Sequence, residues 1–165
     1  MIGRALLILV AVLSLMTAGC ISQPTVELYG ARVSGISPAG LGVTMSMKVR
    51  NANSFDVYVR DVRADVVIAN RYRLPTVQIS PNAWLPADGN TMVVVPVVIP
   101  WQMLTPLIAT TVGSTTIPYT MRGAANVVAT RAMRIDLNDY TFDQDGKLYR
   151  NEIVAAAGRG FLGGP

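Results

Sequence analysis

VTMSMKVRNANSFDVYVRDVRADVVI, residues 43–68, carries the clearest structural signal in the chain. Apolar and polar residues alternate on both sides of an asparagine-rich break at residues 51–54. Side chains alternate between the two faces of a β-strand, whereas a helix repeats about every 3.6 residues, so this pattern predicts two half-buried strands joined at a corner. The apolar faces comprise Val43, Met45, Met47 and Val49 before the break, and Phe55, Val57, Val59, Val62, Ala64, Val66 and Ile68 after it.

Further short strands are expected on the C-terminal side of this stretch. The valine-rich run at residues 91–99 contains Pro96, which cannot donate a ladder hydrogen bond, so this strand is expected at a sheet edge or with a bulge. With about seven short strands separated by turns, the sequence predicts an all-β fold, a single β-sandwich of immunoglobulin or fibronectin type III character. The other alternating segments are residues 76–79, 117–121 and 133–137.

Residues 101–112 break the strand pattern. They have no period of two, and their apolar residues fit one or two helical turns interrupted by Pro106. This segment is therefore predicted to be a crossover between the sheets. The apolar residues in question are Trp101, Leu104, Leu107 and Ile108.

The amino terminus has the order of features found in a secretory signal. Arg4 is followed by an apolar run at residues 5–16, which is too short to span a hydrocarbon layer of about 30 Å as a helix. Small residues then precede Cys20, the single cysteine of the chain. Cleavage before Cys20 would make this residue the first of the mature protein.

The sequence Thr17-Ala18-Gly19-Cys20 resembles the lipobox of bacterial lipoproteins, although Thr17 stands where leucine, valine or isoleucine is usual. The resemblance implies that the Cys20 thiol is acylated, and two or three acyl chains hold a protein firmly at a membrane. Ile21, in place of the aspartate that favours inner-membrane retention, implies an outer membrane lipoprotein that faces the periplasm. The alternative is an ordinary secretory signal, which would leave a free thiol near the amino terminus.

The chain is expected to form one domain, because the 146 residues that remain after cleavage suit a single core. We expect a glycine-rich C-terminal tail that is too flexible to hold structure alone. The expected segments are a lipoprotein signal peptide at residues 1–19, a lipidated tether at 20–25, the β-sandwich at 26–152 and the flexible tail at 153–165.

Composition argues against several classes of function. The mature chain would carry 13 basic and 10 acidic side chains without clusters, which gives no surface for nucleic acid. The chain has no histidine, so histidine-dependent nucleophilic catalysis is impossible, and no phosphate-binding loop is present. We expect no catalytic residues, no cofactor and no enzymatic activity.

One segment partly matches a calcium-binding loop. In TFDQDGKLYRNE, residues 141–152, Asp143, Asp145 and Glu152 fall at ligand positions of an EF-hand. Thr141 replaces the aspartate of the first position, and no amphipathic helix precedes the loop. Because Asp-x-Asp-Gly is also a common turn sequence, we expect a plain hairpin turn and no metal here.

Three more motifs are present in the predicted sandwich: Asn51-Ala52-Asn53, then Pro86-Ala87-Asp88-Gly89 ahead of the valine-rich run at 93–98, and Tyr119 with Gly123. In this order they resemble the WHy domain, the water-stress and hypersensitive-response module of the group 2 late embryogenesis abundant proteins. The sequence departs from the family at Ala52, where the signature has proline. The resemblance covers roughly residues 26–150 and implies a role in stress tolerance.

Asn51 and Asn53 have a physical explanation of their own. Asparagine side chains bond nearby backbone groups and tolerate left-handed conformations. We therefore expect the pair to be a structural latch at a strand corner, with a ligand site as the less favoured alternative.

Two functions remain open. The first is a non-enzymatic envelope lipoprotein that protects unfolding client proteins under water, heat or cold stress. The alternative is a structural adaptor that docks one specific envelope partner through a sheet edge. The strand around Pro96 and the crossover at Trp101 are the candidate contact surfaces.

Overall fold

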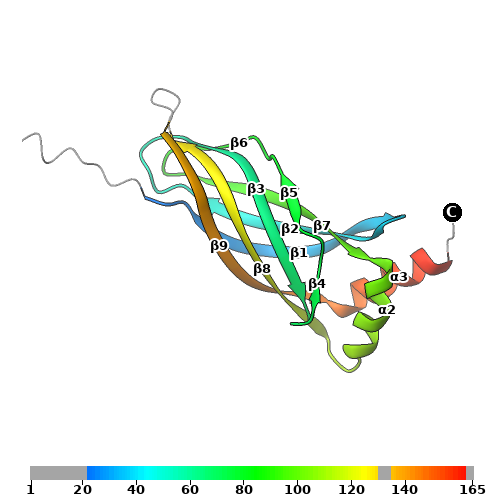
Figure 1. Cartoon of the computed structure of the whole chain (residues 1–165). Coiled ribbons are helices and arrows are strands. Elements are labelled where there is room, and N and C mark those ends of the chain that lie inside the picture. Colours follow the sequence, from blue (N-terminus) through cyan, green and yellow to red (C-terminus); the bar gives the residue numbers. More distant parts are fainter. Residues whose placement is uncertain (1–21, 130–134, 163–165) are drawn as a thin grey trace, which may run out of the picture.

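The computed structural model describes residues 22–129 and 135–162, and within them two antiparallel β-sheets pack face to face (Figure 1). This confirms the predicted all-β sandwich. One sheet has the order β1 (Thr25–Ser37), β2 (Gly40–Arg50) and β7 (Asn90–Pro100). The other sheet contains β3 (Val57–Ile68), β8 (Thr116–Ala129), β9 (Ile135–Tyr149) and the short strands β4 (Tyr72–Arg73), β5 (Val77–Ile79) and β6 (Ala83–Leu85), all three of which pair with β3.

The two strands predicted from residues 43–68 are β2 and β3, and their apolar faces meet in the core between the sheets. In β3 the buried positions change from odd-numbered residues, such as Val59, to even-numbered ones, beginning at Val62. A β-bulge between Val59 and Asp61 causes this change, because one extra residue reverses which side chains face inward. The same shift is visible in the sequence pattern.

The sequence pattern did not reveal β1, although this strand has 13 residues. Its pairing with β2 shifts register between Leu28 and Gly30 and again between Val33 and Gly35. Two bulges in one strand destroy the period-two signal. Together with the short β4 and β6, this strand raises the number of strands in the described residues to nine, above the seven or so that were expected.

The prediction for Pro96 is confirmed, because β7 pairs only with β2 among the described strands and so forms a sheet edge. The crossover is also confirmed as helical. It is α2 (Trp101–Thr110), which contains Pro106 and buries Leu104 and Leu107.

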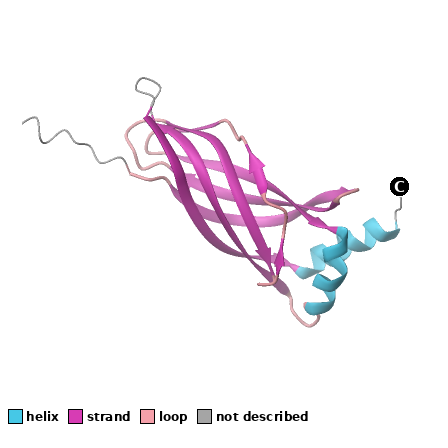
Figure 2. Ribbon diagram, viewed as in Figure 1, coloured by secondary structure: helices cyan, strands magenta, loops and turns pink. Residues whose placement is uncertain are grey.

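The predicted flexible tail is wrong for residues 153–162, because α3 (Arg150–Leu162) is a helix. It lies with α2 at one end of the sandwich (Figure 2). Ile153, Ala156 and Ala157 are buried, and a Cβ atom added to Gly160 would lie 2.1 Å from the ring of Trp101. Glycine weakens an isolated helix, but packing of one face supplies the stability that local propensity lacks.

Ile153 lies on the buried face of α3. Ile153→Ala should lower the free energy of unfolding by about 2 kcal/mol, the low end of the range for such changes, since a terminal helix can shift to fill part of the cavity. Its neighbour Val154 is 37% exposed, so Val154→Ala is the matched control and should change stability by less than about 0.5 kcal/mol. Urea unfolding followed by circular dichroism measures both. Equal effects would show that α3 does not dock.

Two aromatic side chains cover glycines across the pair β8 and β9. Tyr119 is paired in register with Gly146, and Gly123 with Phe142. A Cβ atom would lie 2.5 Å from the Tyr119 ring at Gly146 and 2.4 Å from the Phe142 ring at Gly123. Tyr119 and Gly123, the two residues of the third sequence motif, therefore both serve packing between β8 and β9. Tyr119 covers the glycine of the neighbouring strand, and Gly123 leaves room for the ring of Phe142.

The Tyr119 side chain also carries a hydroxyl group without a hydrogen-bond partner among the described residues. The residue is 1% exposed, and burial raises its pKa from 10.0 to about 12. Because the folded-state pKa is the higher one, stability is fully present below about pH 10 and is lost as pH rises toward 12.

Tyr119→Phe should therefore raise the free energy of unfolding at pH 7 by about 1 kcal/mol, because an unsatisfied hydroxyl leaves the core. It should also reduce the loss of stability between pH 10 and pH 12. Thermal unfolding at a series of pH values tests both points. Destabilisation at pH 7 would show that the hydroxyl is hydrogen-bonded in solution.

Candidate functional site

A buried asparagine cluster closes one end of the sandwich. Asn51 follows β2 and is 0% exposed. Its Nδ2 atom donates to the carbonyl oxygens of Phe55 at 2.7 Å, Leu85 at 3.2 Å and Pro86 at 3.1 Å. Its backbone amide donates to the carbonyl of Gly89 at 2.9 Å. One side chain thus joins the end of β2, the loop before β3 and the turn between β6 and β7.

Asn53 extends this cluster to the amino-terminal segment. Its backbone amide and Nδ2 atom donate to the Asn51 Oδ1 atom at 3.1 and 2.9 Å. The Ser22 amide donates to the Asn53 Oδ1 atom at 2.8 Å, and Asn53 Nδ2 donates to the Ser22 carbonyl at 2.7 Å. Asn53 is 5% exposed. We call this double contact the Ser22 clamp.

The asparagine side chains of the cluster form hydrogen bonds with backbone groups that would otherwise lack partners. Buried carbonyl and amide groups at strand ends need partners, and the two asparagine side chains supply them. The side-chain oxygens and nitrogens of both residues already have protein partners. The structure therefore places Asn51 and Asn53 in a latch, and no sequence signal pointed to Ser22, which lies 31 residues from Asn53.

The residues of the calcium hypothesis lie on an extended strand and a helix. Asp143 and Asp145 belong to β9, and Glu152 lies in the first turn of α3, so the predicted hairpin turn is wrong. Asp143 forms an ion pair with Arg122 at 2.8 Å, and Asp145 accepts a hydrogen bond from Thr120 at 2.7 Å. In residues 22–129 and 135–162, no three acidic, histidine or cysteine side chains are grouped to hold a metal ion.

Cys20 and the signal peptide at residues 1–19 lie outside the described residues. Within the described part of the chain, the helices are too short or too polar to cross a membrane.

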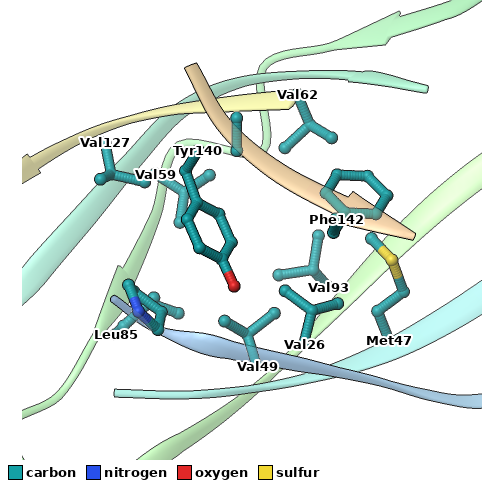
Figure 3. A pocket seen from close by; sticks show the side chains of 12 residues that line it. Val26, Met47, Val49, Val59, Val62, Leu85, Val93, Val127, Tyr140 and Phe142 are labelled. Carbon is teal, nitrogen blue, oxygen red and sulfur yellow. The ribbon is translucent and has the colours of Figure 1, made fainter. Parts of the chain in front are cut away.

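A small apolar cavity lies between the sheets near the asparagine cluster (Figure 3). Tyr140 and Phe142 of β9 reach into it toward Val49, Val93 and Met47. Its volume of about 30 Å³ is far below the roughly 300 Å³ at which ligand pockets begin. This cavity is therefore a gap in the packing between the sheets.

The outer face of β7 carries an apolar stripe formed by Met92, Val94, Pro96 and Val98. Met92 is 47% exposed, Val94 is 50% exposed and Val98 is 37% exposed. The alternate residues of the same strand are buried in the core, so the stripe follows from the uninterrupted valine run.

The second candidate surface, the crossover, is only partly available. Trp101 donates its indole Nε1–H to the Ser37 carbonyl at 3.0 Å, and its ring contacts α3 beside Gly160. This tryptophan serves the docking of α3. The apolar stripe on β7 is thus the better candidate for contact with other molecules.

An aromatic pair lies near the asparagine cluster on β3 and β6. The rings of Tyr58 and Trp84 have centroids 4.9 Å apart, and the Tyr58 hydroxyl donates to the Asn82 Oδ1 atom at 2.6 Å. Asn82 has a positive φ of 47°, as turn residues often do. The pair therefore anchors the turn that leads into β6.

These features define the class of the protein, an antiparallel β-sandwich latched by asparagine side chains at one end. The family model of late embryogenesis abundant proteins matches residues 46–139, more than half of the chain. The chain therefore belongs to this family. A comparison with curated proteins gives no match.

Two solved structures have the same fold. The solution structure of a protein from Arabidopsis thaliana is similar with a TM-score of 0.60 at 15% identity, covering 81% of this chain and 85% of that one. A second solution structure, of a candidate late embryogenesis abundant protein, has a TM-score of 0.54 at 16% identity and covers 80% of this chain and 76% of that one.

Proposed function

We propose that this chain is a bacterial envelope lipoprotein whose domain, of the WHy type, protects other proteins under water, heat or cold stress. Cys20 carries the acyl chains, and the domain faces the periplasm from the outer membrane. Membership of the late embryogenesis abundant family supports a stress-related role. Ala52, where the WHy signature has proline, is exposed, and the latch is built from the asparagines beside it.

The observation that carries the protective role is the apolar stripe on β7. A folded domain can hold a partly unfolded client only through exposed apolar surface or a free sheet edge, and β7 offers both. Pro96 lacks an amide hydrogen, which limits continuous pairing with another strand. The side chains of the stripe are therefore the contact that we expect clients to use.

The test is protection of a model enzyme by the full chain in lipid vesicles during drying or heating. The double variant Val94→Thr and Val98→Thr keeps branched side chains on the strand but makes the stripe polar, and should lose at least half of the protection. Val112 is 72% exposed and follows α2, so Val112→Thr is the matched control and should protect like the wild type. Failure of the wild-type chain to protect would refute the proposal.

The adaptor alternative rests on the same edge strand. Affinity purification from membranes of stressed and unstressed cells separates the two functions. Many partners that appear under stress support protection. One partner present at constant stoichiometry in both samples would make the protein an adaptor.

A further inference from the structure

The Ser22 clamp fixes the place where the amino-terminal segment leaves the domain. Both backbone polar groups of Ser22 are held by the Asn53 side chain. Asn53 is held in turn by Asn51, which has no exposed surface. Ser22 itself is exposed, but both asparagines that hold it are buried, and a buried polar network is rigid when its members are satisfied. Ser22 is therefore part of the domain, although it precedes the first strand.

We propose that this clamp fixes the orientation of the lipid-anchored domain, so that the asparagine end of the sandwich is held against the surface of the bilayer. The inference rests on the acylation of Cys20 in the proposed function. Ser22 follows Cys20 by two positions, a reach of about 7 Å in extended chain. Without the clamp the first residue held by the domain would be the buried Pro24, a reach of about 14 Å from Cys20, and the domain could rotate.

The strand registers show which surfaces this orientation brings to the membrane. The starts of β1 and β7 lie beside the end of β2, because Thr25, Arg50 and Asn90 are paired in register. The loop at residues 52–56 and the turn at 86–89 belong to this same end, because Asn51 and Asn53 bond to both. These two connections are expected to contact the lipid headgroups.

The helices occupy the opposite end (Figure 1). β7 runs for 11 residues from Asn90 to Pro100, roughly 35 Å of strand, and α2 begins directly after it. The apolar stripe on β7 therefore extends away from the bilayer, where proteins in the surrounding compartment can reach it.

The charges of the two connections do not explain this orientation, although the exposed Arg50 lies beside them at the end of β2. Asp56 and Asp88 lie in the connections that face the membrane, and carboxylates are not attracted to anionic headgroups. We expect the covalent geometry to impose the orientation, which should then not change with salt. An electrostatically bound surface would be released as ionic strength rises.

The two tryptophans of the chain provide a test, because they lie toward opposite ends of the sandwich. Trp84 belongs to β6, whose Leu85 carbonyl bonds to Asn51, and Trp101 opens α2. The full chain is reconstituted in vesicles of phosphatidylethanolamine and phosphatidylglycerol with a dansyl label on some headgroups. Energy transfer to the label is measured in the variants Trp101→Phe, which retains Trp84, and Trp84→Phe, which retains Trp101.

Transfer from Trp84 should be at least threefold more efficient than transfer from Trp101, at both low and high salt. Adding Asn53→Ala should bring the two efficiencies within twofold of each other. Equal transfer from the two tryptophans without the Asn53 change would overturn the inference. Loss of the difference at high salt would also overturn it, because that would indicate electrostatic binding.

A second measurement tests the clamp without a membrane. Hydrogen exchange of the Ser22 amide should be slow in the wild-type chain and at least tenfold faster with Asn53→Ala, while the amides of β3 remain unchanged. Asn53→Asp is the second variant, since it keeps an acceptor for the Ser22 amide and should exchange at an intermediate rate. Rapid exchange at Ser22 in the wild type would refute the clamp.

Intact-mass analysis of the same sample separates this inference from the proposed function. A free Cys20 thiol would overturn the lipoprotein assignment. Coupling that single thiol to a maleimide-bearing lipid would then supply the anchor, and the difference between the tryptophans would still decide whether the clamp orients the domain.

Discussion

Replacing Asn51 by alanine should lower the free energy of unfolding by about 4 kcal/mol. Three carbonyl oxygens, those of Phe55, Leu85 and Pro86, would lose the same donor. Asn53 would lose an acceptor for two of its hydrogens. Each buried polar group left without a partner costs about 1 to 3 kcal/mol, and a partly satisfied network is the costly case.

Urea unfolding followed by circular dichroism measures this effect. Asn90→Ala is the matched control, because Asn90 lies at the start of β7 near the same end but is exposed. The control should change stability by less than about 0.5 kcal/mol. A loss below about 1 kcal/mol for Asn51→Ala would show that water replaces the side chain. The latch would then contribute little to the stability of the fold.

The variant Asn51→Asp tests whether residue 51 must donate hydrogen bonds to the three carbonyls. A carboxylate cannot donate to the three carbonyls, whereas a protonated carboxyl can donate to one of them, so the folded state would raise the pKa of the new acid. Stability would then be greatest in acid and would be lost as pH rises through that raised pKa. Stability independent of pH would show that the acid is solvated.

The second large effect is expected at Gly123. Its Cβ atom in Gly123→Ala would lie 2.3 Å from the backbone oxygen of Arg63 on β3 and 2.4 Å from the Phe142 ring on β9. The ring could move by rotation, but a backbone oxygen within a paired strand could not. We expect a loss of about 3 kcal/mol, the cost of overpacking in a close-packed core, and a fall in Tm of roughly 6 to 12 °C.

Gly35→Ala is the control for backbone entropy. Gly35 lies in β1, and a Cβ atom added there would have no neighbouring atom within 4 Å, so alanine should be neutral or stabilising. Differential scanning calorimetry of both variants measures Tm directly. If both glycine changes had the same effect, the close approach of β3 and Phe142 to Gly123 would not exist in solution.

The most successful sequence predictions concern strands in which every second residue is apolar and lies on the same buried face. Val43, Met45 and Met47 are all buried. Burial of one face of a strand requires an apolar side chain at every second position, so the sequence shows the same two-residue repeat. Pro96 predicted an edge strand because the missing donor is a local property of the residue.

The wrong predictions arose where local preference competes with packing. The Asp145-Gly146 pair favours a turn, yet it lies within β9 because Gly146 receives the ring of Tyr119. The glycine-rich carboxyl end suggested a flexible tail, yet Gly160 allows α3 to contact Trp101. In both places a glycine whose local preference is to break structure instead permits a close contact with a distant residue.

The two-faced strands and the asparagines at a strand corner could be predicted from sequence, and Pro96 narrowed its strand to a sheet edge or a bulge, because each of these features depends on residues a few positions apart. The groups that those asparagines hold could be identified from the three-dimensional fold alone. Asn51 bonds to carbonyls 34 and 35 residues away, and Asn53 clamps Ser22 at a separation of 31 residues. Hydrogen bonds between backbone groups so far apart leave no periodic trace in composition, since any residue can offer the same carbonyl and almost any the same amide.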